Sequence, residues 1–247
     1  MMKFVKKYLR SIIIILVISL LLVSCQQSQE ESIDSEQTEV ESGTVGLEYY
    51  PLPDDSYGVM AGQTIYLENI IIPSEYMGKP VTKILDNAFN GANNLKSVTI
   101  PNSITYIGAY SFYNCSNLIS VTIPNSVTNI GERAFSKCSS IINLTISNNV
   151  ETIGDYCFMG CSSIEDLTIP FGVYNIGKYA FAYCSNLKSL VVCESLTHVG
   201  DHAFDDCLKL YQIRYTGSEN KWNAIDIGYG NYNFRYSNIT YNYIPEK

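Results

Sequence analysis

SVTIPNSITYIGAYSFYNCSNLI occupies residues 97–119, and SVTIPNSVTNIGERAFSKCSSII follows it directly at residues 120–142. The two segments share their pattern of apolar, glycine, phenylalanine and cysteine residues at a spacing of 23 residues. The same spacing continues without insertion, and three of its columns are Phe89, Phe112, Phe135, Phe158, Phe181 and Phe204; Gly108, Gly131, Gly154, Gly177 and Gly200; and Cys115, Cys138, Cys161, Cys184 and Cys207. An unbroken repeat of this length indicates stacked copies of one structural unit.

Each copy contains an L-x-x-L-x-L motif, as in LKSVTIP, LISVTIP and IEDLTIP. A period of roughly 20–29 residues with this motif is typical of leucine-rich repeats. The last two apolar positions are two residues apart, so they lie on the same side of a strand, and the threonine between them points to the opposite side. We therefore expect a right-handed, β-dominated leucine-rich-repeat solenoid of about six 23-residue coils, with parallel strands on one face.

The rest of each copy is predicted to close the coil. Pro101 and Pro170 end their strands because proline gives no donor to a ladder, so the coils with Ser147 and Cys193 at this position are expected to be looser there. The repeated glycine is predicted to have a positive φ, at which a β-carbon costs energy. The segment ERAFSKC (residues 132–138) and its copies are expected to form short helical or 3₁₀ turns that place phenylalanine in the core.

The N-terminal segment has the features of an export signal. Four basic residues in MMKFVKKYLR precede an apolar run of 12 residues at 12–23. A membrane-spanning helix needs about 20 apolar residues, so this run is short for an anchor and suits the core of a signal peptide. The run ends in LVSC, which resembles the bacterial lipobox. We expect residues 1–24 to be removed and Cys25 to carry a lipid; the alternative is an uncleaved signal or an ordinary membrane anchor.

The charge of the chain argues against a nucleic-acid partner. The chain has 16 basic and 24 acidic residues, a net charge of −8, and 46% hydrophobic residues. Cleavage before Cys25 would leave 12 basic residues against 24 acidic ones, a net charge of −12, whereas phosphate binding needs a basic face. Residues 25–46 include six acidic residues and no basic one. This segment is predicted to be a disordered acidic tether, the alternative being an acidic binding tail.

The repeat resembles a known family. VTIPNSVTNIGERAFSKCSSI is similar to the BspA-like leucine-rich repeat of bacterial surface proteins, and the likeness extends over residues 47–247. It implies an N-terminal repeat at 47–88, regular repeats at 89–210 and a C-terminal cap at 211–247, in which Trp222 would be a capping side chain. The resemblance also implies adhesion to host proteins or other cells. With the lipobox, it predicts an exported, membrane-anchored lipoprotein at the bacterial cell surface.

The reactive side chains predict no catalytic or metal site. Five of the cysteines lie on one repeat column, which explains their spacing as small core residues. His198 and His202 are four residues apart, but Gly200 between them argues against a helix that would bring both to one metal ion. The chain offers no glycine-flanked nucleophile and no phosphate-binding loop. We therefore expect a protein that is not an enzyme and needs no cofactor or metal.

The outward face of the predicted strands is the candidate binding surface, because solenoids use such extended faces to bind other molecules. Its candidate contact residues are Thr99, Thr122, Thr145, Asp166, Thr168, Gln212 and Arg214. Tyrosines are favoured at interfaces, and the candidate anchors on the turns are Tyr110, Tyr113, Tyr156, Tyr179 and Tyr183. For any one of these residues, a strand-forming or packing role is the simpler explanation.

These features favour a surface adhesion protein that is held to the membrane by its N-terminal lipid and binds an extracellular protein. One alternative is a glycan-binding module, which would require a row of exposed tyrosines along one edge of the coils. Another is a non-catalytic accessory of a surface complex. The repeats are mostly core, so the sequence predicts the fold more closely than the partner.

Overall fold

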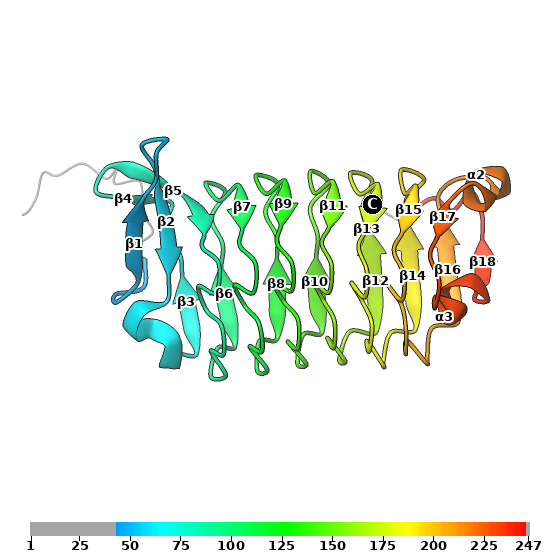
Figure 1. The fold of residues 1–247 in the computed structure, drawn as a ribbon, viewed down its shortest axis with the longest axis horizontal. Helices are drawn as coiled ribbons and strands as arrows, with labels where there is room; N and C mark the ends of the chain where they lie inside the picture. The colour runs from blue at the N-terminus through cyan, green and yellow to red at the C-terminus, as the bar shows by residue number, and fades with distance from the viewer. Residues whose placement is uncertain (1–42, 246–247) are drawn as a thin grey trace, which may run out of the picture. The chain divides into compact units, whose positions relative to one another are not determined.

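The computed structural model describes residues 43–245; the predicted signal peptide, Cys25 and most of the predicted tether lie outside these residues. The described chain is a solenoid of short β-strands that pair from one coil to the next (Figure 1). This architecture confirms the predicted leucine-rich-repeat fold with parallel strands and little helix. No helix within residues 43–245 is long and apolar enough to cross a membrane.

One side of the solenoid carries a sheet of ten strands. The strands are β1 (Glu48–Pro51), β2 (Tyr57–Met60), β4 (Glu75–Tyr76), β5 (Lys79–Ile84), β7 (Tyr106–Ile107), β9 (Asn129–Ile130), β11 (Thr152–Ile153), β13 (Asn175–Ile176), β15 (His198–Val199) and β17 (Asp226–Ile227). Their order is β1-β2-β5-β7-β9-β11-β13-β15-β17, with β4 beside β5. Only the β1–β2 and β4–β5 pairs of this sheet are antiparallel.

The other side carries two parallel sheets of four strands each. The first short sheet contains β3 (Asn69–Ile71), β6 (Ser97–Thr99), β8 (Ser120–Thr122) and β10 (Asn143–Thr145), and the second contains β12 (Asp166–Ile169), β14 (Ser189–Val192), β16 (Gln212–Tyr215) and β18 (Asn238–Thr240). Equivalent residues of neighbouring coils face each other, as Val121 faces Leu144 and Leu167 faces Leu190. The 23-residue period therefore sets the register of both short sheets.

The two short sheets are interrupted between β10 and β12, which share no strand pairing. The interruption follows the coil that carries Ser147, where looser packing was expected. The same prediction is wrong for Cys193, because β14 pairs over four residues with both β12 and β16. Loss of the strand-ending proline is therefore insufficient by itself to loosen a coil.

The core is a continuous stack of phenylalanine rings. All six phenylalanines of the repeat column are fully buried. Successive rings lie 5.0–5.4 Å apart between centres and are nearly parallel, and Phe234 continues the stack at 4.7 Å from Phe204. Each ring buries a large apolar surface and contacts its copies above and below, so the stack couples every coil to its neighbours.

The prediction that the repeated glycines have positive φ is wrong. No glycine of this column is among the residues with positive φ. A β-carbon on Gly131 would instead lie 2.5 Å from the backbone nitrogen of Ala109, and one on Gly177 would lie 2.7 Å from the nitrogen of Asp155. Glycine is required here because the backbone of the preceding coil approaches too closely for any side chain.

The turns after these glycines do not continue as helices. Ser136 N–H donates to Arg133 O (3.1 Å), which is the spacing of a 3₁₀ turn. However, φ is 54° at Arg133 and 63° at Lys137, so each turn ends after one step. Phe135 N–H is left free to bond across to Cys157 O in the next coil (2.9 Å). The predicted short turns are present, and they are bonded between coils rather than along a helix.

Both ends of the solenoid are closed by irregular elements. At the N-terminal end, a 3₁₀ helix (Gly62–Tyr66) precedes β3, and Thr44 N–H donates to Ile71 O (2.9 Å). The C-terminal end adds two short helices, α2 (Glu219–Asn223) and α3 (Tyr232–Arg235). Trp222 of α2 is buried and stacks on Phe234 at 5.2 Å, which confirms its predicted capping role.

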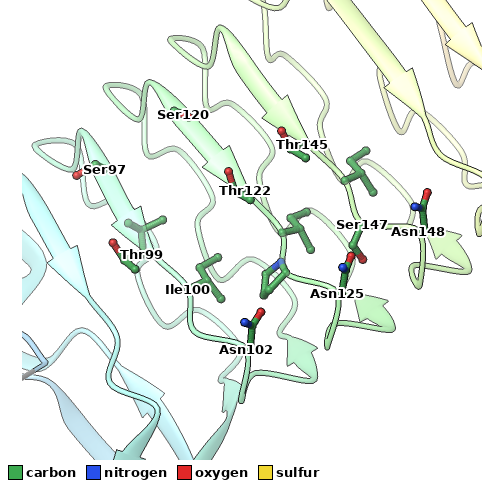
Figure 2. Close-up of a pocket in the computed structure, with 14 residues that line it drawn as sticks. Ser97, Thr99, Ile100, Asn102, Ser120, Thr122, Asn125, Thr145, Ser147 and Asn148 are labelled. Carbon is green, nitrogen blue, oxygen red and sulfur yellow. The ribbon is translucent and has the colours of Figure 1, made fainter. Parts of the chain in front are cut away.

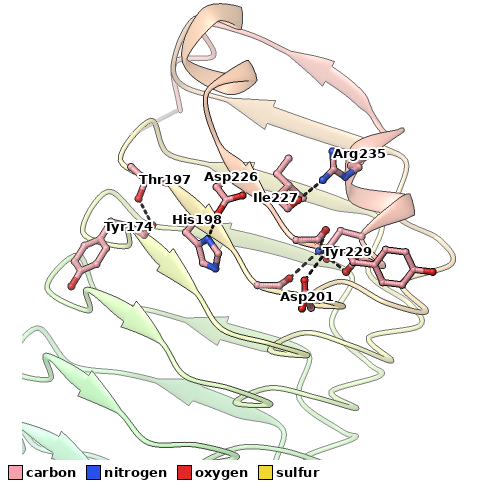
Figure 3. Close-up of polar contacts among 11 residues, drawn as sticks. Tyr174, Thr197, His198, Asp201, Asp226, Ile227, Tyr229 and Arg235 are labelled. Atoms are coloured by element: carbon pink, nitrogen blue, oxygen red, sulfur yellow. Dashed lines mark hydrogen bonds and ion pairs between the residues drawn. The ribbon is translucent and has the colours of Figure 1, made fainter.

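The C-terminal cap is tied to the last coil by polar contacts (Figure 3). Tyr229 N–H donates to Asp201 Oδ1 of the last coil (2.9 Å). Within the cap, the guanidinium of Arg235 donates to Ile227 O. The Arg235 contact occupies a carbonyl on the outermost strand of the long sheet, β17. Occupying such groups reduces the tendency of an edge strand to pair with other chains.

Candidate binding channel

A channel of about 660 Å³ runs across the outward face of the first short sheet, over β6, β8 and β10 (Figure 2). One wall consists of Thr99, Thr122 and Thr145, which point outward from the strands. The other wall consists of Asn102, Asn125 and Asn148, which stand on the turns that follow the strands. Neighbouring parallel strands are about 4.8 Å apart, so each wall repeats its polar group at that spacing.

The walls are uncharged and open to a ligand. No side-chain hydrogen bond involves these six threonine and asparagine side chains within residues 43–245, and all six are exposed. A hydroxyl and a carboxamide can each both donate and accept hydrogen bonds. The floor is apolar and includes Ile100, Ile123 and Ile146. This combination of an apolar floor and polar walls suits an extended chain lying along the solenoid axis.

A second hollow of about 390 Å³ lies over β12, β14 and β16. It meets the channel at Thr145, Ile146 and Asn148, which line both. Its polar lining differs, because it includes Asp166 and Arg214 as well as Thr168. The outward face therefore has an uncharged part and, beyond the break between the short sheets, a part with both signs of charge.

Six of the seven predicted contact residues line these two openings. Gln212 is the exception, because its Nε2 donates to Asn238 O (3.1 Å) and Thr240 Oγ1 (3.2 Å) and so joins β16 to β18. Ser189, which lines the second hollow, is buried, and its hydroxyl donates to Asp166 Oδ1. The asparagine wall was missed in the sequence. Its signal is the repeated P-N or S-N pair after each strand, at the turn positions that asparagine favours.

Comparisons with known proteins place these coils in a family. The sequence model of the BspA-type leucine-rich repeat region matches in six copies over residues 82–211. The chain belongs to the BspA-type leucine-rich repeat family. No curated protein sequence is significantly similar to the chain.

The fold of the BspA-type chain is similar to that of a solved leucine-rich repeat protein. The crystal structure of the leucine-rich repeat protein TpLRR of T. pallidum is similar with a TM-score of 0.65 and 23% identity, over 74% of this chain and 83% of that one. A leucine-rich cell surface protein from Faecalibacterium prausnitzii is 18% identical, with a TM-score of 0.42, over 74% of this chain and 96% of that one. At 23% identity, the likeness to TpLRR shows the fold alone.

An aromatic ladder follows the turn edge of the BspA-type coils. Tyr156 and Tyr179 stack at 5.1 Å, Tyr179 and His202 stack at 4.8 Å, and the guanidinium of Arg133 lies 4.1 Å from the ring centre of Tyr156. Tyr110 accepts a hydrogen bond from Arg133. All five residues have φ between 54° and 57°. Each such backbone costs about 1–2 kcal/mol, which stacking at about 0.5–1.5 kcal/mol per pair offsets in part.

The ladder changes the interpretation of the tyrosines that were predicted as contact anchors. Among the predicted anchors, Tyr183 is exposed and the other four are half-buried. Tyr179 has both ring faces covered, one by Tyr156 and the other by His202. A sugar ring packs on the face of an aromatic ring. The stacked rings of this ladder expose their edges instead of their faces, so they do not suit sugar binding. Tyr156 and Tyr179 therefore hold the turns in register more than they offer contact area.

The cysteines of the BspA-type repeat are core residues. All seven within the described residues are free thiols, and each cysteine of the repeat column donates to the carbonyl of the phenylalanine one coil before it, as Cys138 does to Phe112 O (3.0 Å). Burial raises the pKa of the Cys161 thiol to about 12, and it raises the pKa of Cys157 well above its ordinary value. Little thiolate therefore forms at neutral pH, and the thiolate is the form that attacks and binds metals.

The two histidines have separate partners. His198 Nδ1 lies 2.9 Å from Asp226 Oδ2 in the cap (Figure 3), whereas His202 Nδ1 lies 3.0 Å from Asp205 Oδ2 in its own turn. No group of three or more histidine, cysteine, aspartate or glutamate side chains that could hold a metal ion occurs between residues 43 and 245. The structure thus assigns both histidines to local contacts.

Proposed function

We propose that this protein is a lipid-anchored adhesion module of the bacterial surface, which binds an extended segment of an extracellular protein in the channel over β6, β8 and β10. The single observation that carries this proposal is the channel itself, with its apolar floor and two uncharged walls of repeating polar groups. Proteins built from leucine-rich repeats are generally non-enzymatic binding scaffolds, and family membership supports the same role here.

A protein partner is favoured over a glycan by the position of the aromatic rings. The channel contains no aromatic side chain. On the turn edge, the ring faces of Tyr156 and Tyr179 are covered by each other, by Arg133 and by His202. A peptide backbone needs partners for its N–H and C=O groups when it leaves water. The threonine and asparagine walls provide both donors and acceptors for it.

Blocking the channel tests this function. Thr122→Lys places a long charged side chain in the middle of the channel, and we expect at least about tenfold weaker binding to immobilised extracellular matrix proteins and to host cells. Binding is measured by surface plasmon resonance on a panel of matrix proteins and by cell pull-down. Thr128→Lys is the matched control, because Thr128 is exposed in the same coil but outside the channel. Equal binding by both variants, or no wild-type binding above background, would contradict the proposal.

The anchor is tested separately at Cys25. The wild-type chain is expected to carry a lipid on this residue and to be removed from intact cells by protease. Cys25→Ala is expected to lack the lipid mass, because the side chain that carries the lipid is absent. Intact-mass analysis and protease treatment of whole cells measure both effects. An unmodified Cys25, or a wild-type chain protected from protease, would show that the anchoring or its topology is wrong.

A further inference from the structure

One residue of the channel carries a buried hydroxyl without a hydrogen-bond partner. Ser147 lines the channel at its β10 end, where the channel meets the second hollow (Figure 2). The residue is only 4% exposed, and its Oγ makes no hydrogen bond within residues 43–245. A buried hydroxyl without a partner destabilises the folded state, because the group has given up its hydrogen bonds to water.

The repeat itself does not require this hydroxyl. Ser147 occupies the column in which Pro101, Pro124 and Pro170 follow their strands. Proline has neither a hydroxyl nor a backbone N–H. Serine at this position therefore adds two polar groups that the other two coils of the channel lack, and it does so at a cost in stability.

The backbone N–H of Ser147 is also without a backbone partner. Cys193 lies in the same column two coils later, and its N–H donates to Ile169 O of the preceding coil (3.3 Å). Ser147 N–H makes no backbone hydrogen bond in the part of the chain that the structure describes. The residue thus has an N–H that can only donate and a hydroxyl that can donate or accept. This pair of groups suits an acceptor atom on a ligand.

The charge of the site selects the kind of acceptor. No charged side chain lines the channel, and the chain has a net charge of −8. A carboxylate or phosphate that left water for this site would have no cation to pair with. The carbonyl oxygen of an amide carries no net charge and needs hydrogen-bond donors when it is buried. The site therefore favours a neutral carbonyl over an anion.

We propose that Ser147 is a specificity-determining residue of the channel, whose hydroxyl and N–H donate to an amide carbonyl oxygen of the bound segment. Oγ is out of contact with solvent in the free protein. Rotation about the Cα–Cβ bond to another staggered position turns it into the channel, and this rotation breaks no hydrogen bond. The inference rests on the proposed binding function and adds the group that the partner supplies at the β10 end.

Two measurements on Ser147→Ala test this role in the full-length protein. Loss of an unpaired buried hydroxyl is expected to raise the midpoint of thermal unfolding by about 2–4 °C. The same substitution is expected to weaken binding about fivefold, because the partner carbonyl loses a donor. The probe is whichever of immobilised fibronectin, laminin and type I collagen binds the wild-type chain most tightly. A merely structural role would not move stability and binding in opposite directions.

Ser147→Pro is a second variant that restores the proline of the repeat column. It removes both donors, so we expect at least about tenfold weaker binding to the same probe. The substitution matches the residue at Pro124 and Pro170 of the neighbouring coils, so the variant is expected to fold and to keep or exceed the wild-type unfolding midpoint.

Ser126→Ala is the matched control. Ser126 Oγ is likewise buried and without a partner within residues 43–245, but Ser126 does not line the channel. This variant is expected to gain stability as Ser147→Ala does and to bind the probe with wild-type affinity.

The outcomes separate the role of Ser147 from the proposed function. Wild-type affinity in both Ser147 variants, or equal losses of affinity in Ser147→Ala and Ser126→Ala, would overturn the role of Ser147. Binding that is still lost in Thr122→Lys would then leave the proposed function standing. A lower unfolding midpoint in Ser147→Ala would mean that the hydroxyl is paired in the folded protein, and it would overturn the role as well. No wild-type binding to any of the three matrix proteins or to host cells would overturn both proposals.

Discussion

Replacing Phe135 with alanine is expected to lower the free energy of unfolding by about 4 kcal/mol. The ring is fully buried and stacks between Phe112 at 5.0 Å and Phe158 at 5.4 Å. Its removal leaves a cavity that the flanking coils cannot fill, because their separation is fixed by strand pairing on both sides of the solenoid. Equilibrium urea denaturation followed by circular dichroism measures the loss.

Phe171→Ala is the matched control for this change. Phe171 has the same side chain but is 63% exposed, so its removal is expected to change the free energy of unfolding by less than about 0.5 kcal/mol. Each coil contacts only its neighbours, so the Phe135 cavity also weakens the coupling between the two halves of the solenoid. Similar stabilities for the two variants would mean that the phenylalanine stack contributes little to the fold.

The fold could be predicted from the sequence because every coil meets a copy of itself. A column of identical residues at a fixed period has only one simple geometric explanation, which is stacking in register. Phe112, Cys138 and Ile153 are buried for the same reason as their copies, and the alternation around Thr122 placed the outward face correctly. In this chain, local pattern and tertiary environment agree in almost every coil.

The lining of the candidate channel was predicted only in part, since its second wall comes from turns. Strand alternation fixes the direction of Thr99 and Thr122, but no such rule fixes Asn102 or Asn125. Their position depends on how the turn after the strand folds back over the sheet.

The backbone conformation of the turn edge could not be predicted, because positive φ occurs there at residue types that rarely adopt it. Positive φ is most common at glycine and asparagine, but here it occurs at Tyr156, Tyr179 and His202. These side chains lie over one another only because successive coils repeat the same turn. The sequence therefore indicated exposed tyrosines, whereas stacking between coils covers their faces.

Gly131→Ala is expected to lower the free energy of unfolding by about 3 kcal/mol. The new β-carbon would lie 2.5 Å from the backbone nitrogen of Ala109 and 2.7 Å from the carbonyl carbon of Gly108. Both are backbone atoms of the preceding coil, so the two coils must move apart. That movement strains the strand pairing of β7 with β9 and opens the phenylalanine stack. Urea denaturation of the purified variant measures the effect.

Gly154→Ala distinguishes this explanation from one based on conformational freedom. Gly154 lies in the same column, but its nearest neighbour to an added β-carbon is Ile130 O at 3.0 Å. Since neither glycine has positive φ, conformational freedom alone predicts nearly equal effects for the two substitutions. Close approach of the coils predicts a smaller loss of about 1 kcal/mol for Gly154→Ala. A larger loss at Gly154 than at Gly131 would show that spacing between coils is not the reason for glycine in this column.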